Sequence, residues 1–213
     1  MVQRREFFSP WLASLMIVVF LAAGSLPVSA RADEFADGAT NFIKALTEDA
    51  VTMLTGKDLT KAVRAERFRT LMLKTFSIRG IAKFVLGRHW RKANDEQKKE
   101  YLQLFEDLMV VTYADRFKKY SGEKFLIMRT EVRGKKDVIV YTTMVKANDG
   151  AKPLKVAWRV RAKGDTYTVV DVMIEGISMI MTQKSEFASF IRKSGGGLGD
   201  LLKELKKRVQ NNS

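Results

Sequence analysis

The period of the hydrophobic pattern changes near Gly122, and this change restricts the fold more than any other feature of the sequence. Before it, apolar residues recur at helical spacing; after it, apolar and polar residues alternate as in a half-buried strand. The predicted helices cover 35–54, 59–76, 78–86, 94–120, 185–193 and 198–209. The predicted strands cover 124–131, 137–147, 152–162 and 166–175. The order of helices, strands and helices predicts an α+β fold.

Short turns with Gly separate the predicted strands, so the strands are expected to be antiparallel neighbours. Alternation places an apolar set on one face of the third strand and a second set on the adjacent strand. These sets are Leu154, Val156, Trp158 and Val160, and Ile139, Tyr141, Thr143 and Val145. An apolar sheet face has to be covered, so we expect a curved antiparallel four-stranded sheet wrapped by about six helices.

The N-terminus has the features of a secretory signal peptide. Arg4 and Arg5 precede an apolar run over 11–23, and small residues follow at Ala30 and Ala32. We predict cleavage after Ala32, with cleavage after Ala30 or an uncleaved anchor as alternatives. The general secretory and twin-arginine routes both fit. The expected product is a periplasmic protein with a single domain over 33–213: helices within 33–120, a sheet within 124–175 and C-terminal helices within 185–210.

The chain is strongly basic and has no cysteine. Its formal net charge is +14, and because residues 1–32 hold three Arg and one Glu, the exported part carries +12. Export excludes nucleic acid as the partner, which leaves anionic lipid surfaces and acidic proteins. The basic clusters expected to guide docking are 88–92, 118–119, 133–136 and 203–208.

Few residues could carry out catalysis. His89 is the single histidine and lies among cations, so a metal centre or a thiol or serine nucleophile with a histidine base is not expected. Tyr113 and Asp171 could act as an acid–base pair in an apolar cavity. Packing of Tyr113 and an ion pair of Asp171 with an arginine are favoured instead. The sequence therefore predicts a protein that is not an enzyme and has no cofactor.

Three stretches of the chain resemble the MlaC/toluene-tolerance family of periplasmic phospholipid-binding proteins. They are 81–91 (IAKFVLGRHWR), the aromatic helix from Tyr101 through Tyr120-Ser121-Gly122, and 158–179. In the last stretch the order Asp171, Glu175-Gly176-Ile177-Ser178-Met179 is the most specific part.

This resemblance implies a cone similar to nuclear transport factors, with a strongly curved sheet and a deep apolar cavity. It implies a carrier that moves phospholipid between an outer-membrane lipoprotein and an inner-membrane ABC transporter with an MCE-domain subunit, and so maintains lipid asymmetry. Two acyl chains expose about 30 methylenes, whose transfer through water would cost on the order of 24 kcal/mol. A carrier of another lipid, such as a hopanoid, and an enzyme on the same scaffold are the alternatives.

The expected lipid-binding residues come from the apolar faces of two helices and the sheet. They are Phe84, Leu86, Phe105, Met109, Tyr113, Ile139, Tyr141, Val156, Trp158, Val172 and Ile174. Arg88, Arg91 and Lys92 are expected to contact a lipid head group.

Overall fold

The computed structural model describes residues 28–56, 58–120, 122–146, 152–195 and 197–212. The predicted signal peptide lies mostly outside these residues. No helix of the described ranges is long and apolar enough to cross a membrane. Helix α1 begins at Val28, so cleavage after Ala32 would leave Asp33 at its start.

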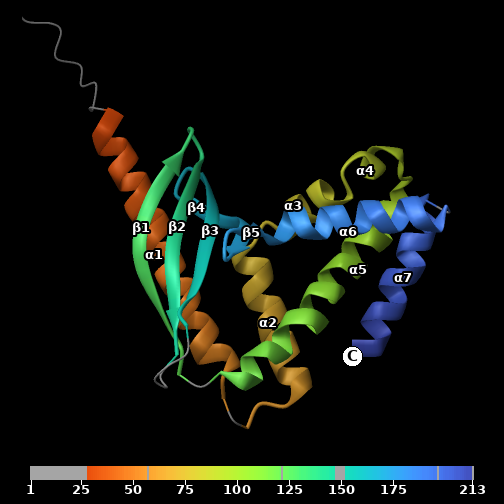
Figure 1. Ribbon diagram of the computed structural model, residues 1–213, viewed down its shortest axis with the longest axis horizontal. Coiled ribbons are helices and arrows are strands. Elements are labelled where there is room, and N and C mark those ends of the chain that lie inside the picture. Colours follow the sequence, from red (N-terminus) through yellow and green to blue (C-terminus); the bar gives the residue numbers. More distant parts are fainter. Residues whose placement is uncertain (1–27, 57, 121, 147–151, 196, 213) are drawn as a thin grey trace, which may run out of the picture.

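The described elements follow the predicted order of helices, strands and helices (Figure 1). The first group is α1 (Val28–Leu54), α2 (Lys61–Thr75), α3 (Ile78–Leu86), α4 (Arg88–Lys92), α5 (Asp95–Tyr113) and the 3-10 helix η1 (Ala114–Lys119). The strands are β1 (Lys124–Arg133), β2 (Asp137–Val145), β3 (Leu154–Lys163), β4 (Thr166–Ile174) and β5 (Ile177–Ser178). The chain then forms α6 (Met179–Ser194) and α7 (Gly197–Asn212). The α+β prediction is confirmed.

Local capping explains where two of the helices begin. Asn94 and Gln97 form the capping box expected at the start of α5: the Asn94 side chain accepts from the Gln97 amide at 2.8 Å. Helix α6 begins earlier than predicted, because Ser178 caps it and accepts from the Met181 amide. The long helix ends earlier than predicted, since the chain tightens into η1 after Tyr113.

The sheet is antiparallel with the strand order β1-β2-β3-β4-β5, one strand more than predicted. Strand β5 has two residues, too few for alternation to reveal. It pairs with β4 across the Glu175-Gly176 turn, where both residues have positive φ (49° and 81°). Two such residues are typical of the tight type I′ hairpin.

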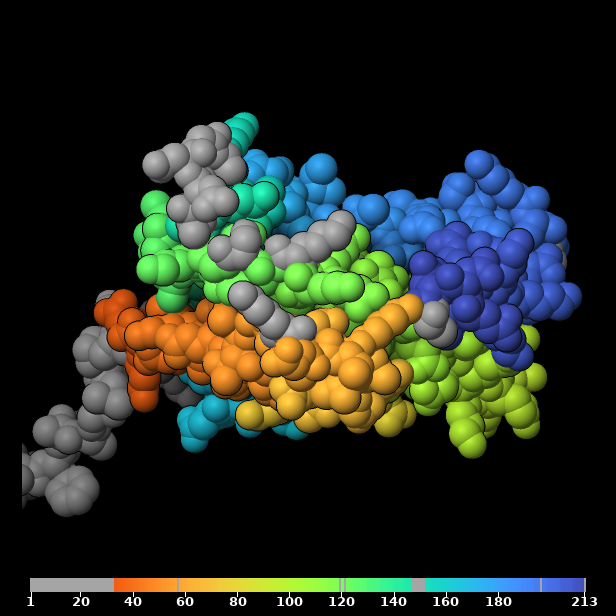
Figure 2. Space-filling model, turned by 90° about the horizontal axis from the view of Figure 1, so that it is seen from below, coloured from red at the N-terminus to blue at the C-terminus, as the bar shows by residue number. Residues whose placement is uncertain are grey.

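Two apolar clusters fill the molecule. One joins α1 to the sheet through Ile43, Leu46, Val138, Val140, Val160 and Val169. The other lies among α3, α5, α6 and α7 and contains Tyr101, Phe105, Phe187, Leu201 and Leu205. Phe68 and Phe76 pack against both clusters, so α2 and the segment after it join the sheet part to the helical part. Seen from below, α1 and α2 form one continuous surface beside β1, and α6 and α7 lie at the far end (Figure 2).

Candidate functional site

One face of the sheet, here called the inner face, is mostly apolar, with Thr130 and Thr142 as its polar members. Directly paired residues share a face, and the register places Val140 opposite Trp158 and Trp158 opposite Val172. At one end of this face, Val138, Val140, Val160 and Val169 are fully buried by α1. Toward the other end, the helices leave the face partly exposed.

This partly exposed end forms a half-buried apolar surface. Its members are Phe125, Met144, Leu154, Trp158, Val172 and Ile174, together with the buried Val156. They come from the start of β1, the end of β2, the start of β3 and the end of β4, which antiparallel pairing brings to the same end of the sheet. Apolar and aromatic side chains of this kind are the usual lining of sites that bind apolar ligands.

Trp158 is held at the centre of the surface. Its indole Nε1 donates to Thr142 Oγ1 at 3.1 Å, and that hydroxyl donates to the Val156 carbonyl oxygen at 2.9 Å. The ring of Phe125 meets the indole edge to face, with ring centres 6.0 Å apart. Because the indole N–H already has an acceptor, the exposed part of Trp158 offers apolar area with no unpaired polar group.

Asp171 joins the sheet to the helical part. Its carboxylate is buried and accepts from Ser178 Oγ at 2.6 Å and from the Ile180 amide at 3.3 Å. The prediction of an ion pair between Asp171 and an arginine is therefore wrong: its partners are Ser178, which caps α6, and Ile180 in the first turn of that helix. The sequence order from Asp171 to Met179 encodes this junction.

A pocket of about 530 Å³ lies between α5, α6 and α7. One of its lining residues, Met179, directly follows the β4–β5 hairpin in the chain. Its lining residues are Leu108, Val111, Thr112, Tyr113, Arg116, Met179, Thr182, Gln183, Glu186, Arg208 and Asn212. The Arg116 guanidinium lies 5.0 Å from the Tyr113 ring centre. This volume suits a small ligand, yet its lining is both apolar and charged, so an enclosed apolar cavity remains a prediction.

The structure brings some of the predicted lipid-binding residues together. Val156, Trp158, Val172 and Ile174 share the inner face. Tyr113 lines the pocket, and Met109 is half-buried against the helical cluster. Their contact with lipid remains a prediction.

Ile139 and Tyr141 do not belong with them. They pair with Arg159 and Ala157 on the opposite, outer face. The Tyr141 hydroxyl donates to Glu131 Oε2 at 3.0 Å, and the Arg129 guanidinium lies 3.6 Å from its ring. The apolar set of β2 was assigned to the wrong parity, because both parities of β2 carry apolar residues and only pairing with β3 distinguishes them.

Three predicted residues from helices also lie elsewhere. Leu86 and Phe105 are 3% and 1% exposed inside the helical cluster. Phe84 is 44% exposed, because α3 buries the opposite side with Ile78, Ala82 and Val85. Arg88, Arg91 and Lys92, predicted at the head group, lie on α4 and are not part of the pocket lining, where the cations are Arg116 and Arg208.

Sequence reasoning missed Phe125, Met144 and Leu154 on the sheet surface and Met179 in the pocket. For Leu154 the signal was present, since it alternates with Val156 and Trp158. Phe125 and Met144 are identified only by the pairing of β1 with β2.

Comparison with known proteins gives consistent results. A profile of the family described as MlaC protein matches residues 44–207. The intermembrane phospholipid transport system binding protein MlaC of Haemophilus influenzae is 25% identical over 114 residues, which are 52% of this chain and 53% of that protein. The chain thus aligns with about half the length of that curated relative.

Among solved structures, the phospholipid-binding protein of Ralstonia solanacearum in complex with a phospholipid has a TM-score of 0.72 to this chain. The sequence identity is 22%, and the match covers 81% of this chain and 97% of that one. This likeness establishes the fold.

Proposed function

The chain belongs to the MlaC family, because residues 44–207 match the profile of that family, and we propose that it is a phospholipid carrier. We propose further that it performs no catalysis. The observation that supports this most directly is the half-buried apolar surface at one end of the inner sheet face. A carrier needs apolar area that is accessible to acyl chains and yet sheltered from most of the solvent. The relatives described above include a phospholipid transport protein and a phospholipid-bound structure.

In this proposal the acyl chains lie on the surface around Trp158, and the pocket between α5, α6 and α7 accommodates the more polar end of the lipid. The pocket suits that end because the Arg116 guanidinium lies in it, whereas the charge of Arg208 is balanced by Glu186 and Glu204. Tyr113 and Asp171, the candidate acid–base pair, make structural contacts instead. Both carboxylate oxygens of Asp171 accept hydrogen bonds from the start of α6, and Tyr113 packs against Arg116.

We further propose that residues 1–32 are removed on export and that the carrier works in the periplasm. Its proposed partners are an outer-membrane lipoprotein that delivers or receives lipid and an inner-membrane ABC transporter with an MCE-domain subunit. These partners follow from the family, and the excess of positive charge is compatible with them.

Native mass spectrometry of the protein recovered from the periplasm, followed by lipid extraction, tests the proposal. We expect about one two-chain phospholipid per protein. Recovery of a polycyclic lipid without phosphate would support a lipid carrier but would show that its cargo is not phospholipid. Repeated recovery of no lipid would reject the carrier itself.

Alternation along β4 supplies a matched pair of variants. Val172→Lys places a charge on the inner face, and Met173→Lys places it on the outer face one residue later. Burying an unpaired ammonium under acyl chains is costly, so we expect at least tenfold less bound lipid for Val172→Lys and normal loading for Met173→Lys. If Val172→Lys does not fold, the near-isosteric Val172→Thr replaces it. Equal loading of both variants would place the lipid elsewhere.

A further inference from the structure

The surface formed by α3 and α4 carries positive charge with little acidic balance. Between Glu66 and Asp95 the chain has eight Lys and Arg and no acidic residue. Five of these cations lie on α3 and α4, and all five are exposed: Arg79, Lys83, Arg88, Arg91 and Lys92. None of the five forms an ion pair within the described part of the chain. Asp95 and Glu96 border the surface, and Asp95 is paired with Lys98 at 3.2 Å.

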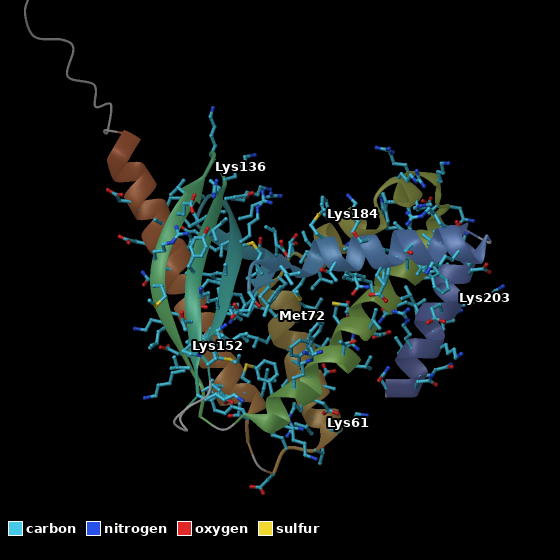
Figure 3. The ribbon with its side chains drawn as sticks, in the orientation of Figure 1. Lys61, Met72, Lys136, Lys152, Lys184 and Lys203 are labelled. Atoms are coloured by element: carbon cyan, nitrogen blue, oxygen red, sulfur yellow. The ribbon has the colours of Figure 1, made fainter. Side chains whose placement is uncertain are left out.

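Two aromatic side chains lie among these cations. Phe84 is 44% exposed, and the ammonium group of Lys184, from α6, lies 4.2 Å from its ring centre. Trp90 is half-buried between the ammonium groups of Lys83 and Lys98, at 5.2 and 5.9 Å. Figure 3 shows Lys184 on α6 beside α3, on the side of the molecule that also carries α4.

We propose that this surface, here called the α3–α4 patch, docks the protein directly on an anionic lipid bilayer. The patch consists of Lys83, Phe84, Arg88, Trp90, Arg91 and Lys92. Lysine and arginine near such a membrane are attracted to its negative charge, and Trp and Phe fit the boundary between head groups and acyl chains. The cations would contact lipid phosphates while the two rings enter the layer below.

A bilayer fits the patch better than an acidic protein does. An acidic protein would neutralise the cations, but Phe84 would also require a matching apolar pocket in it. A bilayer offers both phosphates and apolar depth at every point. Helix α4 also lies at the end of the molecule away from the sheet, where a flat surface can reach it (Figure 1).

The β1–β2 turn offers a matched control. Arg133, Lys135 and Lys136 are also exposed and basic, and Lys136 projects from that turn in Figure 3. Of these three, Arg133 forms an ion pair with Glu131 at 2.8 Å, while Asp137, which lines a pocket beside the turn with them, is paired with Arg159 and Arg161. No aromatic side chain lines that pocket.

Vesicle co-flotation of the protein recovered from the periplasm tests the proposal. The vesicles are phosphatidylcholine alone or with about one third phosphatidylglycerol. We expect binding to the anionic vesicles only, and a loss of about tenfold or more in the variant Arg88→Gln/Arg91→Gln/Lys92→Gln. Arg133→Gln/Lys135→Gln/Lys136→Gln removes the same charge and should weaken vesicle binding about threefold at most. Equal losses in the two variants would overturn the proposal, because net charge alone would then explain binding.

Tryptophan fluorescence tests whether the α3–α4 patch is the surface that meets the bilayer. Quenching is compared between the parent protein and Trp90→Phe, which leaves Trp158 as the single tryptophan after residue 32. Phospholipid brominated near the top of its acyl chains should quench Trp90 on anionic vesicles, and Phe84→Ala should weaken binding several-fold without a change in charge. Vesicle binding without quenching of Trp90 would overturn the proposal, because the protein would then contact the bilayer through another surface.

Membrane docking can fail independently of lipid carriage. The charge variants should retain their bound lipid in native mass spectrometry, since the patch lies outside the half-buried apolar surface. A protein that holds lipid but does not bind vesicles would therefore refute the docking proposal alone.

Discussion

At the scale of single residues, Gly38 shows how a tertiary contact can override helix propensity. Glycine is unfavourable inside a helix, yet Gly38 lies within α1. A Cβ at this position would lie 2.0 Å from the Tyr167 hydroxyl oxygen and 2.5 Å from Cζ. The Tyr167 ring cannot easily move, because it packs between Phe35 and Phe42 with ring centres 6.3 and 6.2 Å away.

Replacement of Gly38 by alanine should therefore destabilise the protein. We expect a loss of about 1–3 kcal/mol in the free energy of unfolding, since overpacking outweighs the gain in helix propensity. Denaturant titration measures this loss. In a Tyr167→Leu background the same change should be neutral or stabilising, and a loss of equal size in both backgrounds would contradict the explanation.

His89 is a residue whose ionisation reports on the α3–α4 patch. Partial desolvation lowers the pKa of its imidazole, and the charges of Arg88 and Lys92 lower it further. Because the chain has one histidine, an NMR titration follows it directly. We expect Arg88→Gln to raise the pKa of His89 and Arg133→Gln to leave it unchanged. An unaltered pKa in Arg88→Gln would leave desolvation and Lys92 as the causes of the lowered pKa.

At the scale of elements, the junction between β4 and α6 depends on Asp171. Asp171→Asn keeps a hydrogen-bond acceptor but removes the negative charge at the start of α6. This should lower the free energy of unfolding by about 1 kcal/mol. Asp171→Ala leaves Ser178 and the Ile180 amide without this partner and should cost more. Hydrogen exchange of the first turn of α6 should speed up in both variants. Unchanged exchange there would show that Ser178 alone fixes the start of α6.

The outer sheet face is held by an ionic cluster around Asp137. Arg161 Nε donates to its carboxylate at 2.7 Å and Arg159 Nε at 2.9 Å. Hydrogen bonds from Arg161 and then Arg159 lower the pKa of Asp137, although burial opposes this shift. The cluster therefore stabilises the fold above the ordinary pKa of aspartate, near 3.9, and the contribution is lost as pH falls through the lowered value.

Asp137→Asn should remove that part of the acid dependence. At neutral pH we expect a loss of about 1–2 kcal/mol, because the hydrogen bonds to a charged acceptor are weakened. Thermal unfolding between pH 7 and pH 2.5 should show a smaller fall in stability for the variant than for the parent protein. Parallel curves would mean that other carboxylates dominate acid unfolding.

At the scale of the whole molecule, the sheet part and the helical part have separate apolar clusters. Phe68 and Phe76 belong to the packing of both, and the Phe76 strand bridge to Val169 attaches the chain after α2 to the sheet. These shared residues should couple the two parts, as the predicted single domain over 33–213 requires. Phe68→Ala removes one shared side chain and tests that coupling.

We expect the exported protein to unfold in one calorimetric transition, because neither cluster is complete without the shared aromatics. Phe68→Ala should lower the midpoint by several degrees and broaden the transition. Leu205→Ala, a buried change confined to the helical cluster, is the control and should lower the midpoint without broadening. Two resolved transitions in the parent protein would refute the single domain.

Periodicity and capping are local, so the amino-acid pattern was enough to predict the type and order of the longer helices and strands, but not the short α4, η1 and β5. Neighbouring residues were enough to predict the capping box at Asn94, the four long strands and the apolar alternation of Leu154, Val156 and Trp158. The resemblance also identified the family, since short motifs such as Asp171 through Met179 depend on residue identity alone.

Which apolar residues share a surface depends on contacts between distant parts of the chain. Tyr141 was predicted to bind lipid together with Trp158 but lies on the opposite face of the sheet, because the register with the partner strand decides which face a residue occupies. Phe105 and Phe84 are both aromatic residues on apolar helices, yet one is enclosed and the other exposed. Burial depends on which helix packs opposite, and that is a property of the assembled fold.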